Sequence, residues 1–369
     1  MKITAGLGSI DEYIRFAEAG ADEFFCGYVP YSWAKKYGTV MPLNRREVFC
    51  YNVQLGSYSE LEILAAMIKK YGKPVHLTFN SLYYIPQQYP EIAEIIQGCM
   101  KLGFHSYIIA DPALILYLRN QGIDCDIHLS GETGEVNSRM VDILQRQKLK
   151  RIIFHRKNTF EDMRSIIHAE QLAGVERVQT EFEAFVLNEM CQFSGAFCNS
   201  LHCDEMGYLC RAPYHLEKIA KKDRLCMFAN DYSSSDFDKI NECKSGNGER
   251  HSRQMSEALD EESEVKDILE DDSWFERYDD TGYLCGETGC GLCALYQLQK
   301  AGITHLKLVG RGNYTDFMEK DIRNLRQALD ILDRNLKNLQ QDQDNEKIFQ
   351  QQMKQTIFQN GCSENCYYR

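Results

Sequence analysis

The chain has 369 residues, of which 44% are hydrophobic and 11% aromatic, and it carries a formal net charge of −12 at pH 7. That length allows one large α/β domain or two ordinary ones, and the acidic excess argues against general binding to nucleic-acid phosphates. The N-terminus, MKITAGLGSI, predicts no signal peptide, and no apolar stretch has the roughly 18–20 residues that cross a bilayer. With fifteen cysteines and no export signal, the sequence favours a reducing cytoplasm.

Short runs rich in β-branched and aromatic residues alternate with helix-length amphipathic segments, as in parallel βα units. The predicted strands cover residues 2–6, 23–27, 75–80, 106–111, 126–130, 151–155, 178–186 and 305–309. The predicted helices cover residues 10–19, 59–70, 89–102, 113–121, 138–147 and 159–172. This pattern predicts a (β/α)8 TIM-like barrel, whose closure need not be regular. A doubly wound sheet is the alternative, although no G-x-G-x-x-G follows the first strand.

Two segments depart from this alternation. Residues 216–284 read as an acidic insertion, since twelve acidic side chains lie between residues 257 and 280, which is typical of a solvated, partly helical or disordered segment. Beyond residue 312, apolar residues at helical spacing predict one long helix from about residue 317 towards 355. The predicted organisation is a barrel at 1–215 and 285–312, the insertion at 216–284, and a C-terminal helix with a cysteine-containing tail at 313–369.

The densest group of reactive side chains follows the strand predicted near residue 181. A polar, glycine-containing loop carries four cysteines within twenty residues: Cys191, Cys198, Cys203 and Cys210. A single cysteine is often only a small buried hydrophobe, but core packing does not call for four thiols in one loop. Thiolates are soft ligands for zinc and iron–sulfur clusters, and a loop lets several converge on one centre. The loop therefore predicts a metal or iron–sulfur site.

The same stretch resembles the signature of peptidase family U-32, the collagenase-like peptidases. Glu183-Ala-Phe185 is similar to the family's E-x-F, and Cys191 and Cys198 keep its two cysteines seven positions apart. Gly195 lies one place early, and Asn188 and Glu189 replace small residues. The next family cysteine precedes an arginine and a nearby tyrosine, and the fourth precedes the final strand; the matching residues are Cys210, Arg211, Tyr214 and Cys293. The resemblance covers roughly residues 1–215 and 285–335.

This resemblance implies a barrel fold and a [4Fe–4S] cluster, with zinc as the alternative, held by Cys191, Cys198, Cys210 and Cys293. Better-understood members of the family resemble oxygen-independent hydroxylases; some act on RNA, and others act on quinone precursors as heterodimers of two family members. The leading hypothesis is an iron–sulfur redox enzyme that hydroxylates or similarly modifies a small-molecule or peptide substrate. The alternatives are a peptidase with a structural metal site, although H-E-x-x-H and G-x-S-x-G are missing, and a non-catalytic subunit of a heterodimeric family complex.

In a barrel, residues at the carboxyl ends of the strands build the active site. Four such residues are candidates for acid–base chemistry: His128, Glu132, Glu181 and Glu183. Seven more are candidates for substrate contact: Asn80, Asp111, Ser130, Arg211, Tyr214, Lys307 and Arg311. Val309 replaces the acidic residue that precedes the Gly-Arg pair of the family, which would leave Arg311 freer to bind a substrate carboxylate. The alternative for each is a hydrogen-bonded polar residue at the barrel mouth or in the core, or, at Arg311, a plain glycine turn.

The remaining cysteines divide into two kinds. Cys285, Cys290 and Cys293 could form a separate zinc knuckle, although the resemblance assigns Cys293 to the main centre. The tail pair Cys362 and Cys366 could cap that centre, join a second one, or form a redox-sensitive tail. Four others lie within strand or helix patterns and are interpreted as packing residues: Cys26, Cys50, Cys99 and Cys125.

Overall fold

The computed structural model describes residues 1–38, 40–47, 53–134, 136–172, 180–191, 198, 278–337 and 342–368. Eight parallel strands close into a barrel: β1 (Lys2–Leu7), β2 (Glu23–Tyr28), β4 (Val75–Phe79), β5 (Ser106–Ile109), β6 (Asp126–Leu129), β7 (Leu149–Ile153), β8 (Glu181–Leu187) and β9 (His305–Leu308). The barrel strands pair in the order β1-β9-β8-β7-β6-β5-β4-β2, and pairing of β1 with β2 closes the ring. The short β3 (Gln54–Leu55) pairs in parallel with the end of β2. The predicted TIM-like barrel is confirmed.

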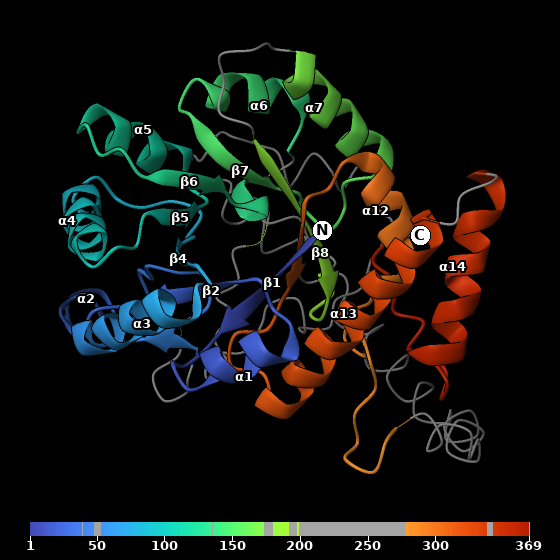
Figure 1. Cartoon of the computed structure of the whole chain (residues 1–369). Helices are drawn as coiled ribbons and strands as arrows, with labels where there is room; N and C mark the ends of the chain where they lie inside the picture. Colours follow the sequence, from blue (N-terminus) through green and yellow to red (C-terminus); the bar gives the residue numbers. More distant parts are fainter. Residues whose placement is uncertain are drawn as a thin grey trace, which may run out of the picture. The chain divides into compact units, whose positions relative to one another are not determined.

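Helices cover the outside of this barrel (Figure 1). They are α1 (Glu12–Ala19), α2 (Tyr31–Tyr37), α3 (Tyr58–Tyr71), α4 (Gln88–Lys101), α5 (Pro112–Asn120), α6 (Ser138–Gln145), α7 (Phe160–Leu172), α12 (Leu295–Ala301) and α13 (Thr315–Lys337). Among the described residues, the 3-10 helix η1 (Gly131–Thr133) follows β6, and the 3-10 helix η5 (Leu292–Ala294) precedes α12. All six predicted helices are present, whereas α2 and β3 were not predicted because each is too short to show a clear hydrophobic period.

Local signals explain where the helices begin and end. α3 starts in a capping box, because the Ser57 hydroxyl accepts from the Glu60 amide while the Glu60 carboxylate accepts from the Ser57 amide. It ends at Gly72, which adopts the left-handed conformation that glycine tolerates best. The strands between the helices are buried on both faces, as β2 is at every position, because helices cover one face and side chains fill the barrel on the other.

The C-terminal region corrects the prediction of a single long helix. The chain forms two helices, α13 and α14 (Asp342–Thr356), which pack against each other (Figure 1). The break lets Phe349 and Met353 of α14 fold back and become fully buried, which a continuous helix projecting into solvent would not allow. The gain from burying two large apolar side chains, about 2 kcal/mol each, favours the helical pair.

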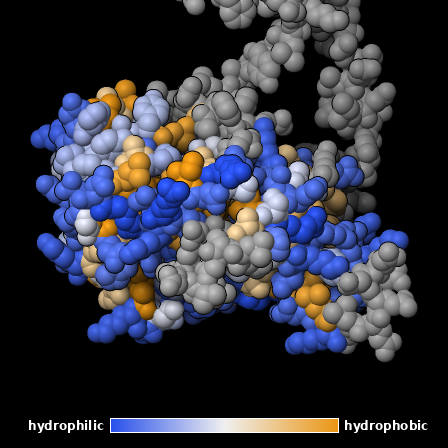
Figure 2. Space-filling view, turned by 90° about the horizontal axis from the view of Figure 1, so that it is seen from above, coloured by the Kyte–Doolittle hydropathy of each residue, from blue (hydrophilic) through white to orange (hydrophobic). Residues whose placement is uncertain are grey.

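The chain divides into two compact units, residues 1–211 with 279–369, and residues 212–278. The predicted acidic insertion lies outside the described residues up to position 277. Within the part of the chain that is described, no helix combines the length and apolarity that crossing a membrane requires. The face seen in Figure 2 is predominantly hydrophilic with hydrophobic residues in scattered groups, as is usual for a protein surface.

Candidate functional site

A small cavity of about 80 Å³ lies at the carboxyl ends of the barrel strands, the end at which TIM-barrel active sites form. Five cationic side chains are among the described residues that line it: Arg45, Arg46, Arg156, Lys307 and Arg311. Two acidic side chains, Glu132 and Glu189, share the lining. The cavity is therefore rich in positive charge although the whole chain is acidic, which suits an anionic group on a small ligand.

The floor of the cavity is apolar. Phe25, Ile108, Ile153 and Phe185 point inward from four strands and form a buried cluster of their own, against which Val309 and Tyr367 pack. Cations border this floor, because the Lys307 ammonium lies 3.7 Å from the Phe25 ring centroid and the Arg156 guanidinium lies 4.1 Å from that of Phe185. The cavity can thus hold an apolar group below a charged one.

Arg311 is a buried cation in the lining of this cavity. Its buried guanidinium donates to the Thr78 hydroxyl and to the Arg46 carbonyl, both at 3.3 Å. Burial, together with the neighbouring charge of Arg46, lowers the pKa of Arg311 to about 10. No carboxylate among the described residues lies within ion-pair distance of it, so an anionic ligand would supply the compensation that a buried cation needs.

Gly27 makes room for this guanidinium. A Cβ atom at position 27 would lie 2.2 Å from Arg311 Nη1. We therefore expect Gly27→Ala to displace the end of Arg311 and to weaken any anion bound there at least tenfold, with a stability loss of about 1–2 kcal/mol. Isothermal titration with small carboxylates and chemical denaturation would measure the two effects. Gly98→Ala is the matched control, since a Cβ atom at position 98 would meet nothing within 4 Å apart from the backbone of its own helix. Equal effects of the two substitutions would contradict the prediction.

Glu132 lies between two arginines at the rim. Its carboxylate is 3.6 Å from Arg45 Nε and 3.7 Å from Arg156 Nη1, and its amide donates to the Ser130 hydroxyl at 3.2 Å. Arg46 pairs with Glu189, which follows β8. The rim is therefore a network of ion pairs in which the cations outnumber the carboxylates.

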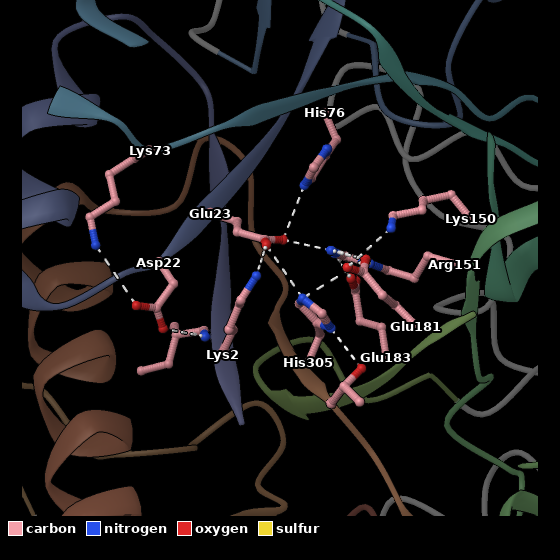
Figure 3. Close-up of polar contacts among 12 residues, drawn as sticks. Lys2, Asp22, Glu23, Lys73, His76, Lys150, Arg151, Glu181, Glu183 and His305 are labelled. Carbon is pink, nitrogen blue, oxygen red and sulfur yellow. Dashed lines mark hydrogen bonds and ion pairs between the residues drawn. The ribbon is translucent and has the colours of Figure 1, made fainter. Parts of the chain in front are cut away.

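Below the cavity, the barrel interior holds a buried ionic network (Figure 3). Arg151 of β7 donates to the carboxylates of Glu23 at 2.7 Å, Glu181 at 2.8 Å and Glu183 at 2.7 Å. Glu23 also lies 3.1 Å from His76 Nε2 and 3.3 Å from His305 Nε2. Barrels are usually filled by branched apolar residues, so this layer is a charged plug at the amino ends of the strands.

Lys307 connects this charged plug to the cavity. Its ammonium donates to Glu183 at 3.0 Å while its side chain also lines the cavity. Burial by itself would raise the pKa of Glu183, but the charges of Lys307 and Arg151 lower it to about 2. Burial lowers the pKa of Lys307, and the Glu183 carboxylate opposes that shift. The two groups therefore form an ion pair that fixes the position of Lys307.

The predicted site residues occupy three kinds of position. Five line the cavity: Asn80, Ser130, Glu132, Lys307 and Arg311. Glu181 and Glu183 belong to the charged plug, and His128 lies beside it, with its ring centroid 4.5 Å from that of His76. Burial, followed by the charges of His76 and Arg151, lowers the pKa of His128 well below its ordinary value, which keeps it neutral. Asp111 accepts from the Ala113 amide at 2.8 Å and so caps α5. Arg211 and Tyr214 lie outside the described residues.

Several residues of the site were not predicted. Arg45 and Arg46 come from the connection between β2 and β3, where no periodic pattern marks them, and Arg156 follows β7. Glu23, His76 and His305 occupy inward positions of β2, β4 and β9. A detectable signal existed for these three, because a charged or imidazole side chain at an inward position of a strand otherwise buried on both faces requires a partner.

Apart from three buried packing residues, the described cysteines fall into two groups. Cys191 and Cys198 lie by the rim arginines: Arg45 donates to the Cys198 carbonyl at 3.3 Å, and the charges of Arg156 and Cys191 interact. Cys293 interacts electrostatically with Cys362 and Cys366, and Cys290 with Cys285, Cys293 and Cys366. Cys210 lies outside the described residues. The packing cysteines Cys26, Cys99 and Cys125 are buried as predicted, and Cys50 lies outside the described part.

Comparison with known proteins identifies the family. The model of peptidase family U32 matches residues 8–367. The U32 peptidase Mk0906 is similar at 15% identity over 50% of this chain and 69% of its own, with a TM-score of 0.37. A conserved Enterococcus faecalis protein of unknown function has 15% identity over 51% of this chain and 49% of its own, with a TM-score of 0.31. A putative phosphonomutase from Burkholderia cenocepacia has 14% identity over 52% of this chain and 81% of its own, with a TM-score of 0.31. No curated protein matches the chain. Because the family model spans nearly the whole sequence, the chain belongs to peptidase family U32.

Proposed function

We propose that the chain is an iron–sulfur redox enzyme that performs an oxygen-independent hydroxylation, or a similar modification, of a small-molecule or peptide substrate at the barrel mouth. One observation carries this proposal: the same two arginines border the cysteine loop and the cavity. Arg45 donates to the Cys198 carbonyl and faces Glu132 of the cavity. Arg156 faces Glu132 as well, and its charge interacts with the Cys191 thiol.

The donor set suits an iron–sulfur cluster. Cys191, Cys198, Cys210 and Cys293 would supply the four thiolates, and a cluster with four thiolates carries net negative charge that nearby guanidinium groups stabilise. Cys191 and Cys198 lie by the arginines of the rim, whereas Cys293 lies near other thiols. Among the described residues alone, no three His, Cys, Asp or Glu side chains converge on one metal position. When bound, the cluster would supply one-electron chemistry next to the cavity.

The residues of the cavity would bind and orient the substrate. Arg311 and Arg46 would bind a carboxylate or another small anionic group, and the apolar floor around Phe25 and Phe185 would hold the rest of the molecule away from water. Two groups of the lining would hold or move a proton: Glu132 at its carboxylate oxygen and Lys307 at its ammonium nitrogen. A cavity of about 80 Å³ favours a compact substrate or a single side chain of a peptide.

The geometry favours this proposal over a peptidase. Among the described lining residues there is no histidine that could activate a nucleophile, and the Ser130 hydroxyl accepts from the Glu132 amide. A hydrolase of the serine or cysteine type needs a base within hydrogen-bond reach of its nucleophile.

Anaerobic purification tests the proposal. We expect a coloured protein that contains about four iron and four sulfide per chain, with the visible absorption of a [4Fe–4S] cluster. Reduction with dithionite should bleach that absorption. A colourless protein that contains zinc but no iron under these conditions would instead support the peptidase or the non-catalytic subunit.

A further inference from the structure

The tail that follows α14 pairs with the segment before η5. Cys366 and Cys290 form a parallel β-bridge, and the Tyr367 amide donates to the Cys290 carbonyl at 2.8 Å. This backbone pairing fixes the course of the tail at its two consecutive tyrosines, Tyr367 and Tyr368. Neither tyrosine was predicted as a site residue.

A glycine lies against the ring of each tyrosine. A Cβ atom on Gly289 would lie 2.4 Å from Tyr367 Cε1, and one on Gly291 would lie 3.1 Å from Tyr368 Cε2. Gly289 also has a positive φ of 152°, which side chains other than hydrogen disfavour. The segment before η5 therefore has the two glycines that let the tyrosine rings pack directly on its backbone.

Both tyrosines contact Phe185 or the cluster to which it belongs. The Tyr367 ring packs against the apolar floor of the cavity, and the Tyr368 hydroxyl donates to the Phe185 carbonyl at 2.7 Å. The register of β8 against β9 shifts between Phe185 and Leu187, and an irregularity of this kind disrupts the ladder locally. The tail therefore supports Phe185 at the point where the pairing of its own strand is weakened.

Phe185 in turn shapes the cavity. Its ring lines the cavity floor, and the Arg156 guanidinium lies 4.1 Å from the ring centroid. Neither Tyr367 nor Tyr368 is among the described residues that line the cavity. Any effect of the two tyrosines on a bound ligand must therefore act through the floor.

We propose that Tyr367 and Tyr368 are positioning residues that hold Phe185 in place and so set the preference of the cavity for a carboxylate with an apolar group over a bare carboxylate. A displaced Phe185 would remove apolar contacts from the ligand, whereas Arg46 and Arg311 would still face its carboxylate. The inference rests on the proposed function only in taking the cavity as the substrate site, and it does not require the cluster.

Isothermal titration of the full chain with isobutyrate and with formate tests the inference. Isobutyrate should bind more tightly than formate, because only isobutyrate can contact the apolar floor. Tyr368→Phe removes one hydrogen bond to Phe185 and should weaken isobutyrate binding about fivefold while it leaves the affinity for formate unchanged. Arg311→Met should weaken the binding of both carboxylates, which would place them in the cavity.

Tyr13→Phe is the matched control for Tyr368→Phe. The Tyr13 hydroxyl also donates to a backbone carbonyl at 2.7 Å, that of Lys73, and neither residue lines the cavity. Both substitutions should lower the urea midpoint of unfolding by a similar amount, because each removes the same kind of hydrogen bond. Only Tyr368→Phe should change the ratio of the two carboxylate affinities.

Two substitutions at Tyr367 separate the role of its ring from that of its hydroxyl. The hydroxyl is buried and has no hydrogen-bond partner in the described part of the chain, so Tyr367→Phe should leave both affinities unchanged. Tyr367→Ala removes the ring from the floor and should weaken isobutyrate binding while it leaves formate binding unchanged.

Four results would overturn the inference. They are a wild-type chain that binds neither carboxylate, a wild-type chain that does not prefer isobutyrate, an unchanged preference in both Tyr368→Phe and Tyr367→Ala, and an equal loss of both affinities in these variants. Iron analysis decides the proposed redox activity separately. A chain without iron whose preference for isobutyrate falls in Tyr368→Phe would refute the iron–sulfur enzyme and leave this inference standing.

Discussion

Replacing Arg151 by methionine should lower the free energy of unfolding by about 3–5 kcal/mol, because it removes one member of a buried ion-pair network. The Arg151 side chain is 2% exposed, and its guanidinium contacts Glu23, Glu181 and Glu183. Without it, three carboxylates would remain in the barrel with too little positive charge to compensate them. Urea denaturation at neutral pH measures the loss.

The stability loss caused by Arg151→Met should depend on pH. The pKa of Glu183 is lowered from 4.5 to about 2, so this group stabilises the fold above about pH 4.5, and its contribution is lost as pH falls towards 2. In the variant the remaining carboxyls protonate more readily, because protonation removes the uncompensated charge. The stability difference between wild type and variant should therefore narrow as pH falls.

Arg139→Met is the matched control. The Arg139 side chain is 89% exposed and lies 3.7 Å from Asp142, and an exposed ion pair of this kind contributes about 0–1 kcal/mol. A loss at Arg151 no larger than that at Arg139, or a difference that grows as pH falls, would show that the network does not hold the barrel together as described.

Serine at Cys191, Cys198, Cys210 or Cys293 should each reduce the iron content of the anaerobically purified chain to near zero, because each would remove one of four cluster ligands. The chain should still fold, since among the described residues the barrel core contains neither Cys191 nor Cys198 and has Cys293 only at its edge. Iron and sulfide analysis together with the visible spectrum measures the loss, and circular dichroism reports the fold.

Cys99→Ser and Cys125→Ser serve as controls, because both residues are buried among apolar neighbours. They should keep full iron content and lose only about 1 kcal/mol of stability. Cys293 is the most discriminating position, since the structure describes it near Cys362 and Cys366. Full iron content in the Cys293 variant would show that Cys293 is not a cluster ligand. The fourth ligand would then have to be another cysteine.

The sequence by itself determined the barrel and part of its mouth. Eight strands and six helices were readable because each is a local pattern, with a period of two or of 3.6 residues, bounded by turn residues. The position of Ser130 and Glu132 at the cavity followed from the same patterns, because parallel strands of a barrel all end at one mouth. The cysteine loop and the family resemblance were also readable from the sequence, because each depends on short contiguous stretches of residues.

Only the tertiary structure decided which side chains meet. Arg151 pairs with Glu23, 128 positions earlier, and closure of the barrel, not any local period, creates that contact. The same holds for Arg45 and Arg46, which reach the cavity from an aperiodic connection, and for Cys366 of the tail, which pairs with Cys290 in a β-bridge. The break between α13 and α14 was also invisible in the sequence, because it depends on the apolar surface that Phe349 and Met353 bury after the chain has turned back.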